Sequence, residues 1–102
     1  LEPGSMKETA LRELKEETGC TAAHLEELGN FYVGPGTFSQ ACHVFLATGI
    51  EHGEPEREKS EEGMQVKSVT IRELQHAIIS GEIVDGPTIS ALQLVILHEK
   101  LI

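Results

Sequence analysis

The run of residues 12–20, Arg-Glu-Leu-Lys-Glu-Glu-Thr-Gly-Cys, constrains this chain more than any other feature, because it combines a carboxylate-rich helix with a glycine that ends it. At about 100° per residue, Glu13, Glu16 and Glu17 share one face of a helix, while the neighbouring leucines face the other way. We therefore predict a helix over Met6–Thr18, with the following glycine as its left-handed C-terminal cap.

The shared carboxylate face points to a divalent-metal site. Like charges three or four positions apart destabilise a helix by a few tenths of a kcal/mol per pair, so a counter-ion is expected. Mg²⁺ suits the position, because it prefers carboxylate oxygens and usually sits between one or two carboxylates and a substrate phosphate. Glu13 and Glu17, one turn apart, are the candidate ligand pair, with Glu16 supporting them. Arg12 lies four residues before Glu16 and four after Glu8, so it can pair with either, and we predict that it orients a carboxylate. The alternative is an ordinary Glu-rich surface helix.

Composition and charge exclude several classes of partner. The chain has 102 residues, no Trp, eight Lys and Arg residues and a net charge of −9, which fits one small domain with a modest aliphatic core. Nucleic acids and anionic membranes are held by Lys and Arg, so neither is expected as a partner. No apolar run approaches the roughly 18 residues of a membrane span, and no signal peptide is expected.

The cysteines and histidines indicate no metal or disulfide framework. Cys20 and Cys42 lack C-x-x-C spacing, which favours buried thiols in a reducing cytoplasm over a disulfide. No EF-hand spacing of acidic residues occurs, which argues against a calcium-binding protein. No zinc-ligand spacing connects the histidines, which are His24, His43, His52, His76 and His98.

Two strands, a long polar loop and a third strand are expected after the first helix. Leu28–Val33 is apolar and aromatic and runs into a Gly-Pro-Gly turn. Cys42–Ile50 has apolar residues on both faces, which predicts a central strand. Glu51–Gly63 is a polar loop rich in glutamate, of a length that is usually functional or disordered. Met64–Val69 is predicted to be a strand.

Two helices are expected to complete the chain. Thr70 and Glu73 form a capping box that starts the first of them, and Gly81 ends it. Pro87 lies in the first turn of the second, whose apolar stripe runs almost to the C-terminus.

The run at 12–20 resembles the second half of the Nudix box, G-x5-E-x7-R-E-U-x-E-E-x-G-U, where U is a bulky apolar residue. Every fixed polar position of that half matches, and Cys20 is a soft match at the final apolar position. The first half departs from the pattern, because Gly4 stands where the box has glutamate. Either the preceding loop is shortened, or Gly4-Ser5 is a remnant of cloning and the native chain starts at Met6.

The resemblance implies an α/β fold: an α/β/α sandwich with a mixed sheet, here a single partial Nudix domain over residues 1–102. We expect it to be incomplete, because the strands that precede the box in this family are missing. A sheet without neighbours exposes unpaired edges, which predicts a homodimer.

Three later segments resemble the branch of the family that hydrolyses ADP-ribose and related nucleoside diphosphate sugars: Phe31–Gly36, Val44–Thr48 and Gly81–Gln93. The resemblance implies that Pro35 and Gly36 contribute to substrate binding. Ser39-Gln40-Ala41 departs from the branch, which often has an acidic residue there.

The resemblance also implies a general base on the polar loop. An ungapped alignment back from Gly81 places Glu62 at that position, with Glu61 as its neighbour and substitute. Glu16 is a further candidate catalytic residue. The expected activity is hydrolysis of ADP-ribose or a similar nucleoside diphosphate derivative to AMP and a sugar phosphate, with Mg²⁺ or alternatively Mn²⁺. The alternative is an inactive, truncated relic that serves as a dimerising or binding module.

Overall fold

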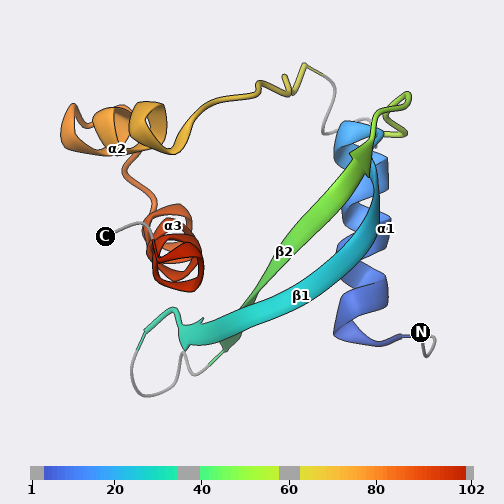
Figure 1. The fold of residues 1–102 in the computed structure, drawn as a ribbon, viewed down its shortest axis with the longest axis horizontal. Helices are drawn as coiled ribbons and strands as arrows, with labels where there is room; N and C mark the ends of the chain where they lie inside the picture. Colours follow the sequence, from blue (N-terminus) through green and yellow to red (C-terminus); the bar gives the residue numbers. More distant parts are fainter. Residues whose placement is uncertain (1–3, 35–39, 58–62, 101–102) are drawn as a thin grey trace. The chain divides into compact units, whose positions relative to one another are not determined.

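The computed structural model describes residues 4–34, 40–57 and 63–100. A helix is followed by two strands and then two helices, as Figure 1 shows. This mixture confirms the predicted α/β class. The chain divides into two compact units, unit 1 (Leu1–Glu26 with Phe45–Lys67) and unit 2 (Glu27–Val44 with Ser68–Ile102), and the two strands contribute to both. The elements are α1 (Met6–Thr18), β1 (Thr21–Tyr32), β2 (Ala41–Glu51), α2 (Ile71–Ile79) and α3 (Gly86–Glu99).

Helix α1 in unit 1 has the predicted bounds, and both of its ends are capped. The Ser5 hydroxyl accepts a hydrogen bond from the Glu8 backbone N–H at 3.1 Å, which satisfies one of the unpaired donors of the first turn. Gly19 takes the left-handed conformation with φ 76°, and its N–H donates to the Lys15 carbonyl at 2.8 Å. These local caps explain why the helix could be located from the sequence.

Strands β1 and β2 form a two-stranded antiparallel sheet. Ala23 lies against Gly49, and Glu27 contacts His43, so the partner number falls as the residue number rises. Strand β2 agrees with the prediction to within one residue at each end. Strand β1 begins at Thr21, seven residues before the predicted start, because pairing with β2 extends it beyond its apolar part.

The predicted central position of β2 is wrong for the described part of the chain, where β1 is its one partner and residues 48–51 are exposed. The predicted strand Met64–Val69 is also wrong. These residues have no regular structure and are exposed, including Met64, Val66 and Val69. A strand exists only through hydrogen bonds to a neighbouring strand, and the described residues supply none for this segment. Alternating apolar residues alone could not reveal that.

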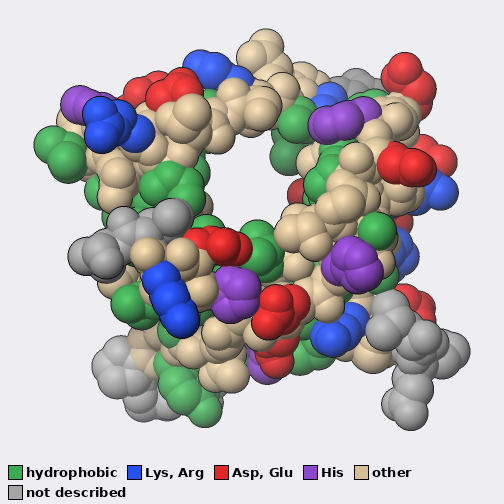
Figure 2. Space-filling model, viewed as in Figure 1, with side chains coloured by type: hydrophobic (Ala, Val, Ile, Leu, Met, Phe, Trp, Pro, Cys, Tyr) green, Lys and Arg blue, Asp and Glu red, His purple; other side chains and the backbone are tan. Residues whose placement is uncertain are grey.

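Unit 2 contains α2 and α3. The predicted capping box is present, with the Thr70 hydroxyl accepting from the Glu73 N–H at 3.1 Å and the Glu73 carboxylate accepting from the Thr70 N–H at 3.2 Å. Leu92 and Ile96 on α3 are buried. Hydrophobic side chains remain at the surface over α2, as Figure 2 shows, and Ile79 is 84% exposed. Burial in unit 2 therefore centres on one face of α3.

None of the described helices has both the length and the apolar character needed to cross a membrane.

Asp85 caps the N-terminus of α3 and gives this helix a pH dependence. Hydrogen bonds from the hydroxyl and then the backbone N–H of Thr88 lower the pKa of the Asp85 carboxyl below its ordinary value. Because the folded pKa is depressed, the cap contributes fully above the unfolded-state pKa of about 3.9 and is lost as the pH falls through the folded pKa.

We therefore expect the Thr88 amide resonance to shift in a titration step below about pH 4, together with a loss of α3 helicity. Asp85→Asn should keep the cap and remove this step, because asparagine accepts the same hydrogen bond without titrating. An unchanged Thr88 step in Asp85→Asn would show that another group causes it.

Candidate functional site

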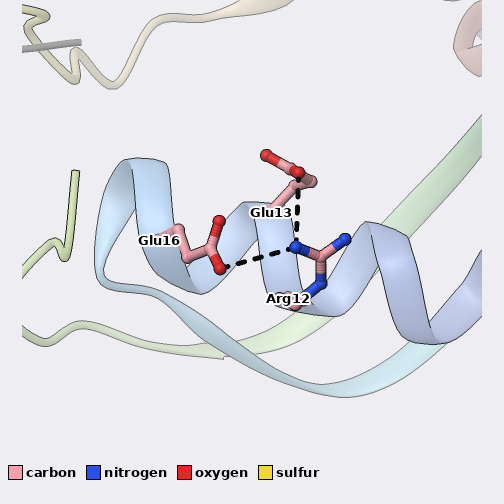
Figure 3. A network of polar contacts seen from close by, with 3 residues as sticks. All are labelled: Arg12, Glu13 and Glu16. Carbon is pink, nitrogen blue, oxygen red and sulfur yellow. Dashed lines mark ion pairs between the residues drawn. The ribbon is translucent and has the colours of Figure 1, made fainter. Parts of the chain in front are cut away.

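The carboxylate face of α1 is present and accessible. Side-chain exposure is 46% for Glu13 and 30% for Glu16. One guanidinium nitrogen of Arg12 lies 3.7 Å from a Glu16 carboxylate oxygen and 3.9 Å from a Glu13 carboxylate oxygen, as Figure 3 shows. Of the two partners that the spacing allows for Arg12, Glu8 and Glu16, the ion pair with Glu16 is the one observed at four-residue spacing. Exposed pairs of this kind contribute about 0.2–1 kcal/mol each, so they add little to the stability of the helix. The orienting role of Arg12 stays a prediction.

Glu17 occupies the last turn of α1, one turn beyond Glu13. Its backbone carbonyl accepts a hydrogen bond at 2.9 Å from Nε of Arg57, which lies 40 residues later. The carbonyl of the preceding Glu16 accepts from the Glu56 backbone N–H at 2.8 Å. Two of the three candidate carboxylate residues are therefore held through their backbone by a segment that follows β2.

The same end of α1 is closely packed. Gly19 lies so near the backbone of Gly53 that a Cβ atom at Gly19 would stand 2.1 Å from the Gly53 carbonyl oxygen. Next to it, the buried Cys20 thiol lies 3.4 Å from Nδ1 of His52. Both predicted thiols are free, and Cys42 is partly buried. Close backbone approach explains why glycine is needed on both sides of this junction.

Glu56 and Arg57 were not identified from the sequence. Both lie in the glutamate-rich loop predicted over Glu51–Gly63, where a single arginine has no distinguishing local pattern. Their contacts with α1 span 40 residues of chain, a separation at which residue spacing carries no signal. The sequence offers one signal for Arg57, which is its positive charge. A cation is favourable near a helix C-terminus, so a basic residue in the loop after β2 is a candidate for a contact with the end of α1.

The donor chemistry at α1 fits a hard divalent cation in part. Carboxylate oxygens are the ligands such a cation prefers, and Mg²⁺ commonly uses one or two of them together with water and substrate phosphate. Among residues 4–34, 40–57 and 63–100, however, no three His, Cys, Asp or Glu side chains gather closely enough to hold a metal ion. The α1 face can therefore supply part of a coordination shell, with Glu13, Glu16 and Glu17 as its candidate donors.

Four of the predicted site residues lie outside the described part of the chain. They are Pro35 and Gly36, predicted to bind substrate, and Glu61 and Glu62, predicted to supply the base. Their roles stay predictions.

Unit 2 has a groove of about 500 Å³ between α2 and α3. Its lining is mainly apolar, and Arg72 and His76 are the basic residues among its polar side chains. None of the predicted site residues lines it, and a pyrophosphate would find few cationic donors there. We therefore assign it no part in the candidate site. Its lining residues are Arg72, Gln75, His76, Ile78, Ile79, Ile89, Leu92, Gln93 and Ile96.

The Nudix domain family matches residues 2–91 of the chain. This span includes the carboxylate face of α1 and the residues Glu56 and Arg57 that contact the end of this helix. The chain belongs to the Nudix family. It is 42% identical to the ADP-ribose pyrophosphatase of Bacillus subtilis over 103 aligned residues, covering 99% of this chain and 56% of that protein.

Two further relatives extend the comparison. The ADP-ribose pyrophosphatase of Mycobacterium tuberculosis is 35% identical over 82% of this chain and 41% of that protein. The GDP-mannose pyrophosphatase of Pectobacterium atrosepticum is 32% identical over 91% of this chain and 49% of that protein. The chain thus spans about half the length of the curated relatives it matches.

Proposed function

We propose that this chain is a Mg²⁺-dependent pyrophosphohydrolase that cleaves ADP-ribose, or another nucleoside diphosphate derivative, to AMP or its counterpart and a sugar phosphate. The observation that carries the proposal is the alignment of nearly the whole chain with a protein named for ADP-ribose pyrophosphatase activity. The accessible carboxylate face of α1 supports it, because pyrophosphate chemistry needs a divalent ion near the phosphates. The match to a GDP-mannose pyrophosphatase supports a nucleoside diphosphate sugar as the substrate class.

Each candidate residue has a separate role in this proposal. Glu13 and Glu17 ligate the metal ion, and Glu16 supports its shell. Arg12 orients the carboxylates through the ion pairs at 3.7 and 3.9 Å. Glu62, with Glu61 as its substitute, acts as the base, while Pro35 and Gly36 contact the substrate. When bound, the divalent ion neutralises the phosphate oxygens.

The reaction consumes one water molecule. The base accepts a proton as the water oxygen attacks one phosphorus atom of the pyrophosphate. The bridging P–O bond breaks, and its electron pair goes to the leaving phosphate, which yields two phosphomonoesters. For ADP-ribose these are AMP and a sugar phosphate.

AMP release from ADP-ribose tests the proposal. The chain is incubated with ADP-ribose and Mg²⁺, in parallel with Mn²⁺ and with EDTA, and products are separated by anion-exchange chromatography. GDP-mannose is assayed alongside, with GMP as the expected product. Turnover that requires the metal is the expected result, and the relative rates rank the two substrates. Absence of turnover with both substrates and both metals would contradict the proposal for this chain.

One feature favours the alternative of an inactive dimerising or binding module. Gly4 stands at the box position of a glutamate, so this carboxylate is absent at the start of α1. Binding without turnover, measured by calorimetry with ADP-ribose and Mg²⁺, would favour this alternative over hydrolysis.

The proposal includes a homodimer in the cytoplasm. A two-stranded hairpin is marginally stable alone, and its outer backbone groups invite pairing with another strand. The free cysteines are compatible with a reducing compartment. We expect light scattering to give about twice the chain mass of 11.1 kDa over a range of concentrations. A mass of one chain at every concentration would contradict the dimer.

A further inference from the structure

The C-terminal end of α1 is held by one short segment that follows β2. We call residues His52–Arg57 the α1 clamp, which lies at the end of β2 beside α1 in Figure 1. The last carbonyl groups of any helix lack partners within the helix. Here the clamp supplies hydrogen-bond donors to two of these carbonyl groups. The Glu56 N–H donates to the Glu16 carbonyl at 2.8 Å, and Arg57 Nε donates to the Glu17 carbonyl at 2.9 Å.

The clamp contacts the helix end along its length. At its start, His52 lies against the Cys20 thiol at 3.4 Å. The Gly53 backbone packs against Gly19 so closely that neither position has room for a side chain at the contact. Contacts from three successive parts of the clamp therefore meet the C-terminal end of α1 and the two residues that follow it.

We infer that Arg57 is a positioning residue for the candidate cation site, acting through the backbone of Glu16 and Glu17. A guanidinium donor forms a stronger hydrogen bond to a carbonyl than a neutral donor does. Its positive charge is also favourable at a helix C-terminus, and it partly offsets repulsion among the nearby carboxylates. By holding the last turn, Arg57 orders both carboxylates before a cation arrives, so less ordering remains to be done on binding.

Arg57 differs in this respect from Arg12, which contacts carboxylate oxygens directly. The contact from Arg57 Nε is to the Glu17 backbone carbonyl and not to a carboxylate, so a cation that binds the carboxylates can displace Arg12 without displacing Arg57. The inference rests on the proposed function, since the site it serves is the proposed metal site.

The test uses two readouts on the 102-residue chain, neither of which requires turnover. The first is amide hydrogen exchange of the Gly19 and Glu56 N–H groups without metal, because both donate to carbonyls of the last turn. The second is the affinity for Mn²⁺ alone, from the electron paramagnetic resonance signal of the free ion. The variants are Arg57→Gln, Arg57→Lys and the control Lys67→Gln, which loses the same charge from an exposed position in unit 1.

We expect Arg57→Gln to accelerate exchange at both amides about tenfold and to weaken Mn²⁺ binding about tenfold. Arg57→Lys should recover part of both effects, because lysine keeps the charge and can donate. Lys67→Gln should stay within about twofold of the unaltered chain, as expected for an exposed surface change.

Each other result overturns a stated part of the inference. Unchanged exchange in Arg57→Gln would show that Arg57 does not hold the helix end. Accelerated exchange with unchanged Mn²⁺ affinity would show that it holds the helix without positioning the site. If the unaltered chain binds no Mn²⁺, the proposed metal site fails, and the exchange data alone then show whether Arg57 clamps α1.

Discussion

Replacing Glu17 with glutamine is expected to lower AMP release from ADP-ribose by at least about a hundredfold. Glutamine has nearly the same size and can keep the helix, but its neutral amide is a far weaker ligand for a hard cation than a carboxylate. The backbone contact from Arg57 to the Glu17 carbonyl does not involve the side chain and should survive the substitution. The loss should therefore fall on metal binding and turnover, not on folding.

Glu8→Gln is the matched control for this substitution. It removes the same charge from the same helix, about two and a half turns towards the N-terminus, and Glu8 has no proposed part in catalysis. Rates are measured at the Mg²⁺ concentration that saturates the unaltered chain and at ten times that concentration. A rate that recovers at the higher concentration indicates a weakened metal site, and one that does not recover indicates a lost catalytic step. Equal rates for Glu17→Gln and Glu8→Gln would rule out Glu17 as a ligand.

Gly19→Ala is expected to destabilise unit 1 by about 3 kcal/mol. With φ at 76°, any residue with a Cβ atom costs about 1–2 kcal/mol at this position. The new Cβ would also stand 2.1 Å from the Gly53 carbonyl oxygen and 2.7 Å from the Glu54 carbonyl carbon. Both are backbone atoms, so the clamp has to move away, and the contacts to Glu16 and Glu17 move with it.

Gly81→Ala separates the two causes. Gly81 follows α2 with a similar φ of 81°, but a Cβ there would meet no atom within 4 Å. It should therefore cost only the conformational part, about 1 kcal/mol. Because the chain divides into two units, urea unfolding is followed by the resonances of α1 for Gly19→Ala and by the resonances of α2 for Gly81→Ala. Equal losses for the two variants would show that the Gly53 contact contributes nothing.

The features predicted well from the sequence are those whose interactions close within a few residues. Helix α1 was located because Gly19 ends it, and α2 because Thr70 and Glu73 satisfy each other across three positions. The ion pair between Arg12 and Glu16 likewise follows from a four-residue spacing on one helix. In each case the local chain contains both partners.

The features predicted poorly depend on partners far along the chain. Strand β1 is longer than predicted because β2 also pairs with residues before its predicted start at Leu28. Met64–Val69 has the composition of a strand, yet the described residues offer it no neighbouring strand. The candidate ligands were identified, but the residues that hold their backbone were not.

By itself, the sequence determined the family of this protein, its carboxylate-bearing helix and the places where its helices begin and end. Short-range hydrogen bonds and the backbone preferences of glycine decide those features. Only the tertiary structure decided how the helix end is held, because Gly53, Glu56 and Arg57 reach it across 34 to 40 residues. Folding brings such residues together through the pairing of β1 with β2, and no residue spacing records that pairing.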